Sequence, residues 1–254
     1  MAEGPFAGQV VLITGAGSGF GAEAVRRFAA QGARLVLSDL HAIQDLPAGE
    51  VLDHPADVSH PGQVEALHRA ALDKFGQIDV AINNAGVGHD LAPLTDIPVA
   101  EFDRIMAVNA RGVFLGMQHQ LPGMIARQSG VILNVASAAG LVGAAHLSAY
   151  AASKHAVVGL TRAAADEVAR SGVRVNALCP SFAETPLFHD MADAVGARHD
   201  LNREAAATRI AARIPMRRVA RVDEVVQAML WACDPANTFM TGQAIAIDGG
   251  LTAV

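Results

Sequence analysis

The chain has 254 residues, and 19 Lys and Arg against 25 Asp and Glu give it a net charge of −6. A modest negative charge, with only 17% charged residues, argues against nucleic acid or a membrane surface as the main partner. No basic patch followed by an apolar stretch opens the sequence, and no apolar run approaches the roughly 20 residues of a membrane span. We therefore expect a cytoplasmic protein with a small-molecule partner, built as a single domain over residues 1–254.

Short runs rich in Val, Ile and Leu alternate with helix-like stretches along the whole chain. Runs that are apolar throughout predict strands buried on both faces. Their alternation with helices predicts a doubly wound α/β fold of Rossmann type, with a parallel sheet between two helical layers. The expected strands are residues 9–14, 33–38, 78–83, 130–136, 172–178 and 242–247, and the expected helices are residues 19–31, 62–75, 98–127, 148–170 and 222–233.

A glycine-rich turn, Thr14-Gly-Ala-Gly-Ser-Gly-Phe-Gly21, separates the first strand from the first helix. Glycines let backbone N–H groups approach a pyrophosphate closely, and the positive end of the helix dipole favours the anion. A merely flexible turn is the alternative. Because this turn follows the first strand of a βαβ unit, it indicates a dinucleotide site.

The second strand ends at Asp39, which follows Gly21 by 18 residues. A carboxylate at this point can accept hydrogen bonds from the adenosine ribose hydroxyls, and it would repel a 2′-phosphate. No Lys or Arg stands in residues 38–41 or at Ser18. The sequence therefore predicts NAD in preference to NADP, and the alternative for Asp39 is an ordinary solvated strand end.

Ser137, Tyr150 and Lys154 form the strongest candidate for catalysis. Ser137 follows the apolar run of residues 130–136, while Tyr150 and Lys154 lie four residues apart and share a helix face. A phenol with its ordinary pKa of about 10 is a poor base at neutral pH, but an adjacent ammonium and the positive nicotinamide ring would lower that pKa. Tyr150 is the only tyrosine and Lys154 is one of two lysines. We therefore expect Tyr150 to exchange the proton while Ser137 positions the substrate oxygen and Lys154 also binds the nicotinamide ribose.

Asn109 lies within the predicted helix of residues 98–127. An amide there could bend the helix and hold a water that links Lys154 to solvent. Asn109 is therefore the candidate for the proton exit.

Residues 181–216 interrupt the alternation of strands and helices. No strand pattern appears in them, and long insertions in compact domains are usually lids or binding loops. Apolar side chains at Phe182, Leu187, Phe188 and Met191 suit a cover over a ligand. We expect a substrate-covering loop at about residues 181–216.

Taken together, these motifs resemble the short-chain dehydrogenase/reductase family over nearly the whole chain, from Val10 to Gly250. Asn83-Asn84-Ala85-Gly86, Tyr150-Ala-Ala-Ser-Lys154 and Ile247-Asp-Gly-Gly250 belong to the resemblance. It implies a seven-stranded sheet, an NAD(H)-dependent alcohol dehydrogenase or ketone reductase, and usually a homotetramer. The residues it places against the dinucleotide are Gly15, Ser18, Gly19, Phe20, Gly21, Asp39, Asp57, Val58, Asn84, Ala85, Gly86, Tyr150, Lys154, Pro180, Ala183 and Thr185.

The sequence departs from the family after Pro180, where relatives usually have Gly and then Val or Ile two residues further on. Ser181 restricts the backbone more than glycine, and Ala183 offers the nicotinamide amide a smaller contact. Thr185 remains available to bond that amide or the phosphates.

The side chains expected around the substrate are mostly apolar, which predicts an uncharged cyclic or aromatic ketone or secondary alcohol. A sugar phosphate would call for several arginines. The two histidines among these residues could bond a polar substituent or be ordinary surface residues, and neither has the spacing of a metal ligand. The expected residues are His89, Ser137, Leu141, Val142, Gly143, His146, Phe182 and Phe188.

Two rival functions make different demands on the sequence. A non-catalytic NAD-binding sensor or scaffold would keep Gly15, Gly19 and Asp39 but lose a member of the Ser137, Tyr150 and Lys154 set. An NAD-using epimerase or dehydratase would usually carry an added substrate domain and a differently spaced glycine turn.

Overall fold

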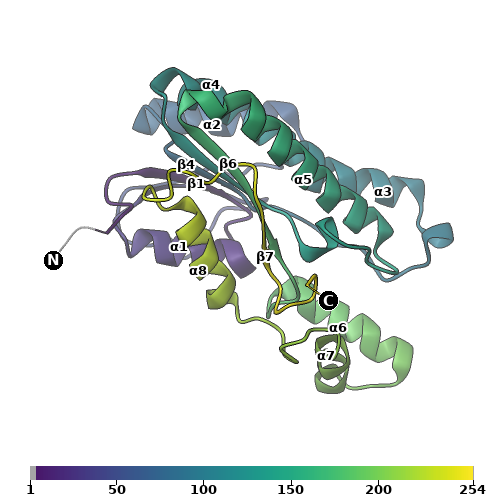
Figure 1. Cartoon of the computed structure of the whole chain (residues 1–254). Coiled ribbons are helices and arrows are strands. Elements are labelled where there is room, and N and C mark those ends of the chain that lie inside the picture. The colour runs from purple at the N-terminus through teal and green to yellow at the C-terminus, as the bar shows by residue number, and fades with distance from the viewer. Residues whose placement is uncertain (1–3, 254) are drawn as a thin grey trace.

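Seven parallel strands form one sheet in the order β3-β2-β1-β4-β5-β6-β7, in a computed structural model that describes residues 4–253 (Figure 1). This confirms the predicted doubly wound fold. The strands are β1 (Val10–Thr14), β2 (Arg34–Ser38), β3 (Val51–Asp53), β4 (Val80–Asn83), β5 (Gly130–Val135), β6 (Val173–Pro180) and β7 (Ala244–Ile247).

The two faces of the sheet are both buried, which is why its strands are apolar at consecutive positions. In β1, Val11 and Ile13 pack in one apolar cluster while Val10 and Leu12 pack in the other. All six predicted strands are present. The seventh, β3, has three half-buried residues and no periodicity that could have predicted it.

Helices cover the sheet on both sides (Figure 1). α1 (Gly19–Ala29) and α8 (Val222–Cys233) pack on one face, and α2 (Pro61–Phe75), α4 (Gly112–Arg127) and α5 (Ser148–Val168) pack on the other. Among residues 4–253, no helix is long and apolar enough to cross a bilayer.

The predicted helix of residues 98–127 is not continuous. α3 (Val99–Met106) passes into a π-helical turn, Ala107–Arg111, before α4 begins at Gly112. Asn109 is fully buried in this turn. A π-helical turn replaces the regular pairing of each N–H with the carbonyl four residues earlier. The helix therefore changes its winding at Asn109, where the sequence predicts a bend.

Residues 181–216, where the sequence predicts a substrate-covering loop, contain two helices that the sequence analysis did not expect: α6 (Pro186–His199) and α7 (Arg203–Ala211). Each begins with a side-chain cap. The Thr185 hydroxyl accepts from the Phe188 N–H at 3.3 Å, and Asn202 Oδ1 accepts from the Ala205 N–H at 2.9 Å. Proline at the first position of α6 adds a second start signal. Both helices lie beyond the sheet, near the C-terminus (Figure 1).

Candidate active site

The glycine-rich turn lies between β1 and the first turn of α1. Gly15 and Gly19 have φ of 64° and 51°, in the left-handed region that favours glycine. A Cβ on Gly21 would lie 1.9 Å from the Gly15 carbonyl oxygen, so no other residue fits there without moving the turn. The predicted role of these glycines in a close backbone approach is consistent with this geometry.

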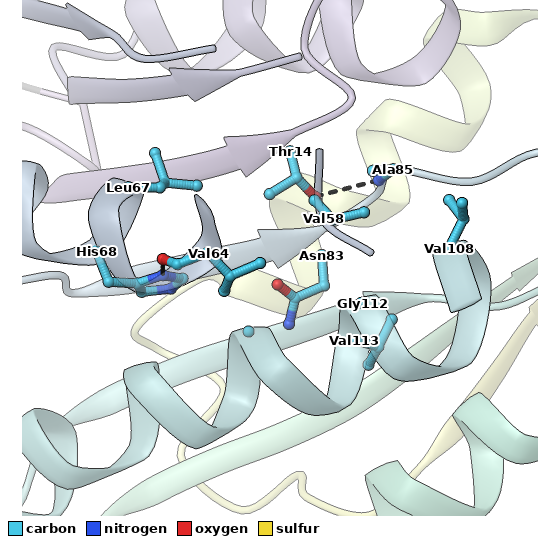
Figure 2. A pocket seen from close by; sticks show the side chains of 11 residues that line it. Thr14, Val58, Val64, Leu67, His68, Asn83, Ala85, Val108, Gly112 and Val113 are labelled. Carbon is cyan, nitrogen blue, oxygen red and sulfur yellow. Dashed lines mark hydrogen bonds between the residues drawn. The ribbon is translucent and has the colours of Figure 1, made fainter. Parts of the chain in front are cut away.

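A second turn, Asn84 to Gly86, is tied to the glycine-rich turn. Asn84 Nδ2 donates to the Thr14 and Gly15 carbonyls at 2.9 and 3.1 Å. Thr14 Oγ1 accepts from the N–H groups of Asn84 and Ala85, both at 3.1 Å, and Figure 2 shows the second of these bonds. The Asn84 side chain thus braces the two turns, which puts the predicted dinucleotide residues of β1 and β4 side by side.

Asp39 closes the other side of the glycine-rich turn. Its Oδ2 accepts from the Gly17 N–H at 2.8 Å and its Oδ1 accepts from the Leu40 N–H at 2.7 Å. A cavity of about 510 Å³ opens beside it, and no Lys or Arg lines this cavity. A glycine turn, a carboxylate and a cavity of this size fit the adenosine part of a dinucleotide. The lining residues are Ala16, Gly17, Ser18, Ala22, Val25, Asp39, His41, Ala42, Ile43, Gln44 and Asp45.

Asp57 and Val58, which the family resemblance places against the dinucleotide, lie at the start of the segment leading into α2. Asp57 Oδ1 accepts from the Ser59 N–H at 2.8 Å. Desolvation raises the pKa of the Asp57 carboxyl, but the hydrogen bonds from the Ser59 side chain and main chain, with the positive charge of Arg111, outweigh it and hold that pKa below its usual value. Val58 packs closely against Gly112, where a Cβ would lie 2.9 Å from Val58 Cγ2.

Beneath these turns lies a buried network of polar side chains, of which Figure 2 shows Asn83 and His68. Asn83 exchanges hydrogen bonds with Gln120 at 2.9 and 3.1 Å and donates to Asn134 Oδ1 at 2.8 Å. Gln120 Nε2 donates to His68 Nε2 at 3.3 Å, while His68 Nδ1 donates to the Val64 carbonyl at 2.7 Å. A cavity of only about 10 Å³ lies among these groups. Asn83 therefore joins β4 to β5, α2 and α4, and His68 must be neutral to accept from Gln120.

Because His68 is buried in its neutral form, the free energy of unfolding should fall in acid. Burial lowers the pKa of His68 to about 4, whereas an unfolded histidine titrates near 6.5. The stability contributed by neutral His68 is complete above pH 6.5 and is lost as the pH falls toward 4. From pH 7 to pH 5 this group should remove about 2 kcal/mol from the free energy of unfolding.

Urea unfolding of the parent and of His68→Asn at both pH values measures this contribution, with His199→Asn, an exposed histidine at the end of α6, as the matched control. The pH difference should shrink by about that amount in His68→Asn alone. Equal pH differences in all three proteins would contradict the assignment.

The predicted catalytic residues come together at the carboxyl end of β5. The Ser137 hydroxyl accepts from the Ala139 N–H at 3.1 Å, and its side chain lies near enough to the Tyr150 phenol to lower the pKa of that phenol. Lys154 Nζ lies 5.6 Å from the centroid of the Tyr150 ring and donates to the Val135 carbonyl at 2.8 Å. A hydroxyl, a phenol and a buried amine thus occupy one small region, as the spacing in the sequence predicts.

The protein groups alone do not lower the pKa of the phenol. Burial raises the pKa of Tyr150, and the nearby Ser137 side chain only partly opposes it. Burial also lowers the pKa of Lys154 to about 8. An activated phenolate therefore needs a further positive charge beside it, which an oxidised nicotinamide ring would supply.

The Asn109 side chain makes three hydrogen bonds to protein groups. Its Oδ1 accepts from the Val87 N–H at 2.8 Å, and its Nδ2 donates to the Val87 carbonyl at 2.9 Å and to Ser153 Oγ at 3.0 Å. Ser153 in turn donates to the Tyr150 carbonyl at 2.7 Å. The sequence predicted a relay through this amide, but its two N–H groups are both used inside the protein. The sequence analysis also missed Ser153, although it stands inside the Tyr150–Lys154 motif.

The segment after β6 runs across the edge of the sheet into α6. Ala183 is buried and pairs with Ala220, while Pro180 ends β6. A Cβ on Gly19 would lie 3.4 Å from Thr185 Cγ2, and one on Gly88 would lie 2.7 Å from Leu187 Cδ1. The start of α6 therefore reaches both the glycine-rich turn and the loop after β4.

The expected substrate residues come from the segment after β6 and from the loops next to the start of α5. Phe182 and Phe188 face each other at 6.3 Å between ring centroids, with Phe188 buried in a cluster of α6 and α7. Val142 and His146 are exposed in the loop before α5, and His146 has a φ of 66°. His89 contacts the first turn of α5, where its Nε2 accepts from the Tyr150 N–H at 3.4 Å.

Known proteins resemble this chain over nearly its full length. A family model described as enoyl-(acyl carrier protein) reductase matches residues 15–252. Cis-4-hydroxycyclohexanecarboxylate dehydrogenase from Sinomonas cyclohexanicum is 40% identical, across 98% of this chain and 98% of its own length.

Two solved structures show the same likeness. The crystal structure of levodione reductase gives a TM-score of 0.93 at 36% identity, covering 98% of this chain and 99% of that chain. The 3-ketoacyl-(acyl-carrier-protein) reductase from Brucella melitensis, complexed with NADH, gives 0.85 at 36% identity, covering 97% and 99%. With its parallel sheet, glycine-rich turn and matches of this extent, the chain belongs to the short-chain dehydrogenase/reductase family of nicotinamide-dependent oxidoreductases.

Proposed function

We propose that this protein is an NAD-preferring dehydrogenase or ketone reductase that moves a hydride between the nicotinamide and an uncharged cyclic secondary alcohol or ketone. The observation that carries the proposal is the contact between the Ser137 hydroxyl and the Tyr150 phenol beside the buried Lys154 amine. A non-catalytic NAD sensor would not need these three groups together.

NAD supplies the hydride acceptor when it is bound, and NADH supplies the donor in the reverse direction. In alcohol oxidation, Ser137 holds the substrate oxygen and Tyr150 Oη removes its proton while the hydride leaves the carbon that bears it. The oxygen then forms the ketone double bond. In reduction, the Tyr150 O–H returns the proton to that oxygen.

Lys154 and Asn109 support the proton transfer in different ways. Lys154 favours phenolate by its charge and bonds the nicotinamide ribose. Since both N–H groups of Asn109 are used, a water at this position would bond the remaining lone pair of Oδ1 or the main chain of the π-helical turn. The proton from Tyr150 would leave through that water.

The dinucleotide would lie along the carboxyl edge of the sheet. The N–H groups of the glycine-rich turn would hold its pyrophosphate, and Asp39 would accept from the adenosine ribose hydroxyls. Ser181 and Ala183 stand where relatives have Gly and Val or Ile, so the nicotinamide amide would depend more on Thr185.

The cyclic substrate is supported by relatives whose names describe action on a hydroxycyclohexanecarboxylate and on levodione. Phe182, which is partly buried against Phe188, offers an apolar contact to such a ring. A panel of cyclic and linear secondary alcohols, ketones and sugar phosphates, assayed with NAD and NADP by absorbance of the reduced cofactor, tests the proposal. Turnover of sugar phosphates in preference to cyclic compounds would refute it.

Asp39→Ala should reduce the preference for NAD over NADP by roughly 10- to 100-fold, an energy of about 1.4 to 2.8 kcal/mol. The carboxylate no longer repels the 2′-phosphate, and its bonds to the ribose hydroxyls are lost. The ratio of kcat/KM for the two cofactors measures the change, and Asp45→Ala, which removes another carboxylate from the lining of the same cavity, serves for comparison. An unchanged ratio in Asp39→Ala would remove that residue from the cofactor argument.

We also propose a homotetramer. Large apolar side chains are exposed on α3 and α4, which include Val99, Phe102, Phe114 and Ile125. Sedimentation velocity would measure the assembly, and a monomer would exclude it.

A further inference from the structure

His89 lies in the loop after β4, yet its ring contacts the helix that carries Tyr150. Its Nε2 accepts from the Tyr150 main-chain N–H at 3.4 Å, and its Nδ1 donates to the Asp90 carbonyl at 2.8 Å. This pair of bonds requires a neutral ring with its proton on Nδ1. In that state both nitrogens are used by main-chain groups, and neither is left for a substrate.

Tyr150 stands in the first turn of α5, where the N–H groups have no partner inside the helix. The residue before the helix, Leu147, provides no side-chain cap. His89 therefore supplies from another part of the chain the acceptor that a capping side chain would normally supply.

The loop after β4 is connected to both main-chain groups of Tyr150: directly to its N–H and, through Asn109 and Ser153, to its carbonyl. Val87 binds Asn109, Asn109 donates to Ser153, and Ser153 donates to the Tyr150 carbonyl. His89 binds the Tyr150 N–H from the other direction. We propose that His89 is a positioning residue for Tyr150, and that only its neutral form holds the tyrosine in place. This inference rests on the proposed role of Tyr150 in proton transfer.

Protonation of His89 would break the contact in two ways. Nε2 would lose its lone pair, and a positive ring would face the positive end of the α5 dipole. Three charged groups are linked to this loop. Glu101 of α3 interacts electrostatically with His89, but Arg104 pairs with Glu101 at 2.7 Å and also donates to the Gly88 carbonyl. Asp90, whose carbonyl accepts from the His89 ring, lies in the same loop. His146 is a further titratable group, in the loop before α5, and its carbonyl accepts from the Ala92 N–H.

The single tyrosine makes a direct test possible without a known substrate. Labelling with ¹⁵N-tyrosine gives one main-chain amide signal, that of Tyr150, in the NMR spectrum of the full protein. Because a protonated ring cannot accept the bond, this signal should move upfield in its proton dimension when acid protonates His89. In His89→Gln, where an amide oxygen can accept the bond without titrating, the movement should disappear. Any residual movement from Lys154 would be common to both proteins.

Activity provides the second measurement. His89→Ala should lower kcat roughly 10- to 100-fold at pH 8, His89→Gln should restore most of it, and His199→Gln should match the parent. In acid Tyr150 is protonated, as ketone reduction with NADH requires, so acid should slow this reaction only through His89. The rate should therefore fall in acid in the parent but not in His89→Gln. An amide signal that moves identically in parent and His89→Gln, or a fully active His89→Ala, would overturn the proposal. Tyr150→Phe tests the proposed function separately, since the NMR result does not depend on turnover.

Discussion

Tyr150→Phe should lower kcat for alcohol oxidation by about 10³-fold, within the 10²- to 10⁴-fold range of acid–base catalysis. The substitution removes only the hydroxyl that exchanges a proton with the substrate oxygen. NADH binding, followed by fluorescence, and the thermal unfolding midpoint should stay close to those of the parent. A folded Tyr150→Phe variant that binds the dinucleotide and oxidises alcohols at the parental rate would exclude the mechanism.

The same residue can be followed by ultraviolet titration, because it is the only tyrosine. Burial holds its pKa above the ordinary value in the protein alone. Addition of NAD should bring that pKa down, since the positive ring then stands beside the phenol. Alcohol oxidation, which needs phenolate, should therefore rise with pH through the lowered pKa, and ketone reduction, which needs the phenol, should fall.

Lys154→Met should have the second large effect, a loss of 10²- to 10⁴-fold in kcat/KM. Methionine keeps much of the length but provides neither the charge that favours phenolate nor the bond to the ribose. The residual oxidation should require more alkaline pH, because the nicotinamide ring alone then lowers the pKa of Tyr150. The Val135 carbonyl also loses its partner, which should cost about 1–3 kcal/mol of stability.

The other lysine provides a matched control. Lys74 is exposed at the end of α2 and donates to the Val51 carbonyl at 2.7 Å, so Lys74→Met removes the same kind of bond far from Tyr150. We expect it to leave the pH profile of oxidation unchanged. A Lys154→Met profile that coincides with that of Lys74→Met would show that the charge of Lys154 has no part in the reaction.

Local signals in the sequence determined most of the sheet and the position of the candidate catalytic groups. Continuous apolar runs predict strands because a sheet covered on both faces buries every side chain. A spacing of four residues brings Tyr150 and Lys154 to one helix face whatever surrounds them. α6 and α7 were missed even though Thr185-Pro186 and Asn202 are helix-start signals, because α6 is only weakly amphipathic and buries few side chains.

Contacts between distant segments were decided only by the tertiary structure. β3 has too few residues for a pattern and exists because β2 offers it an edge. The buried surroundings that raise the pKa of Tyr150 and lower that of Lys154 also come from packing, since desolvation depends on atoms from many parts of the chain. The contact between His89 and Tyr150, which lie 61 residues apart, also comes from packing. No periodicity in the sequence could reveal that its ring binds the N–H of that tyrosine, because hydrogen bonds across a fold depend on where the elements meet.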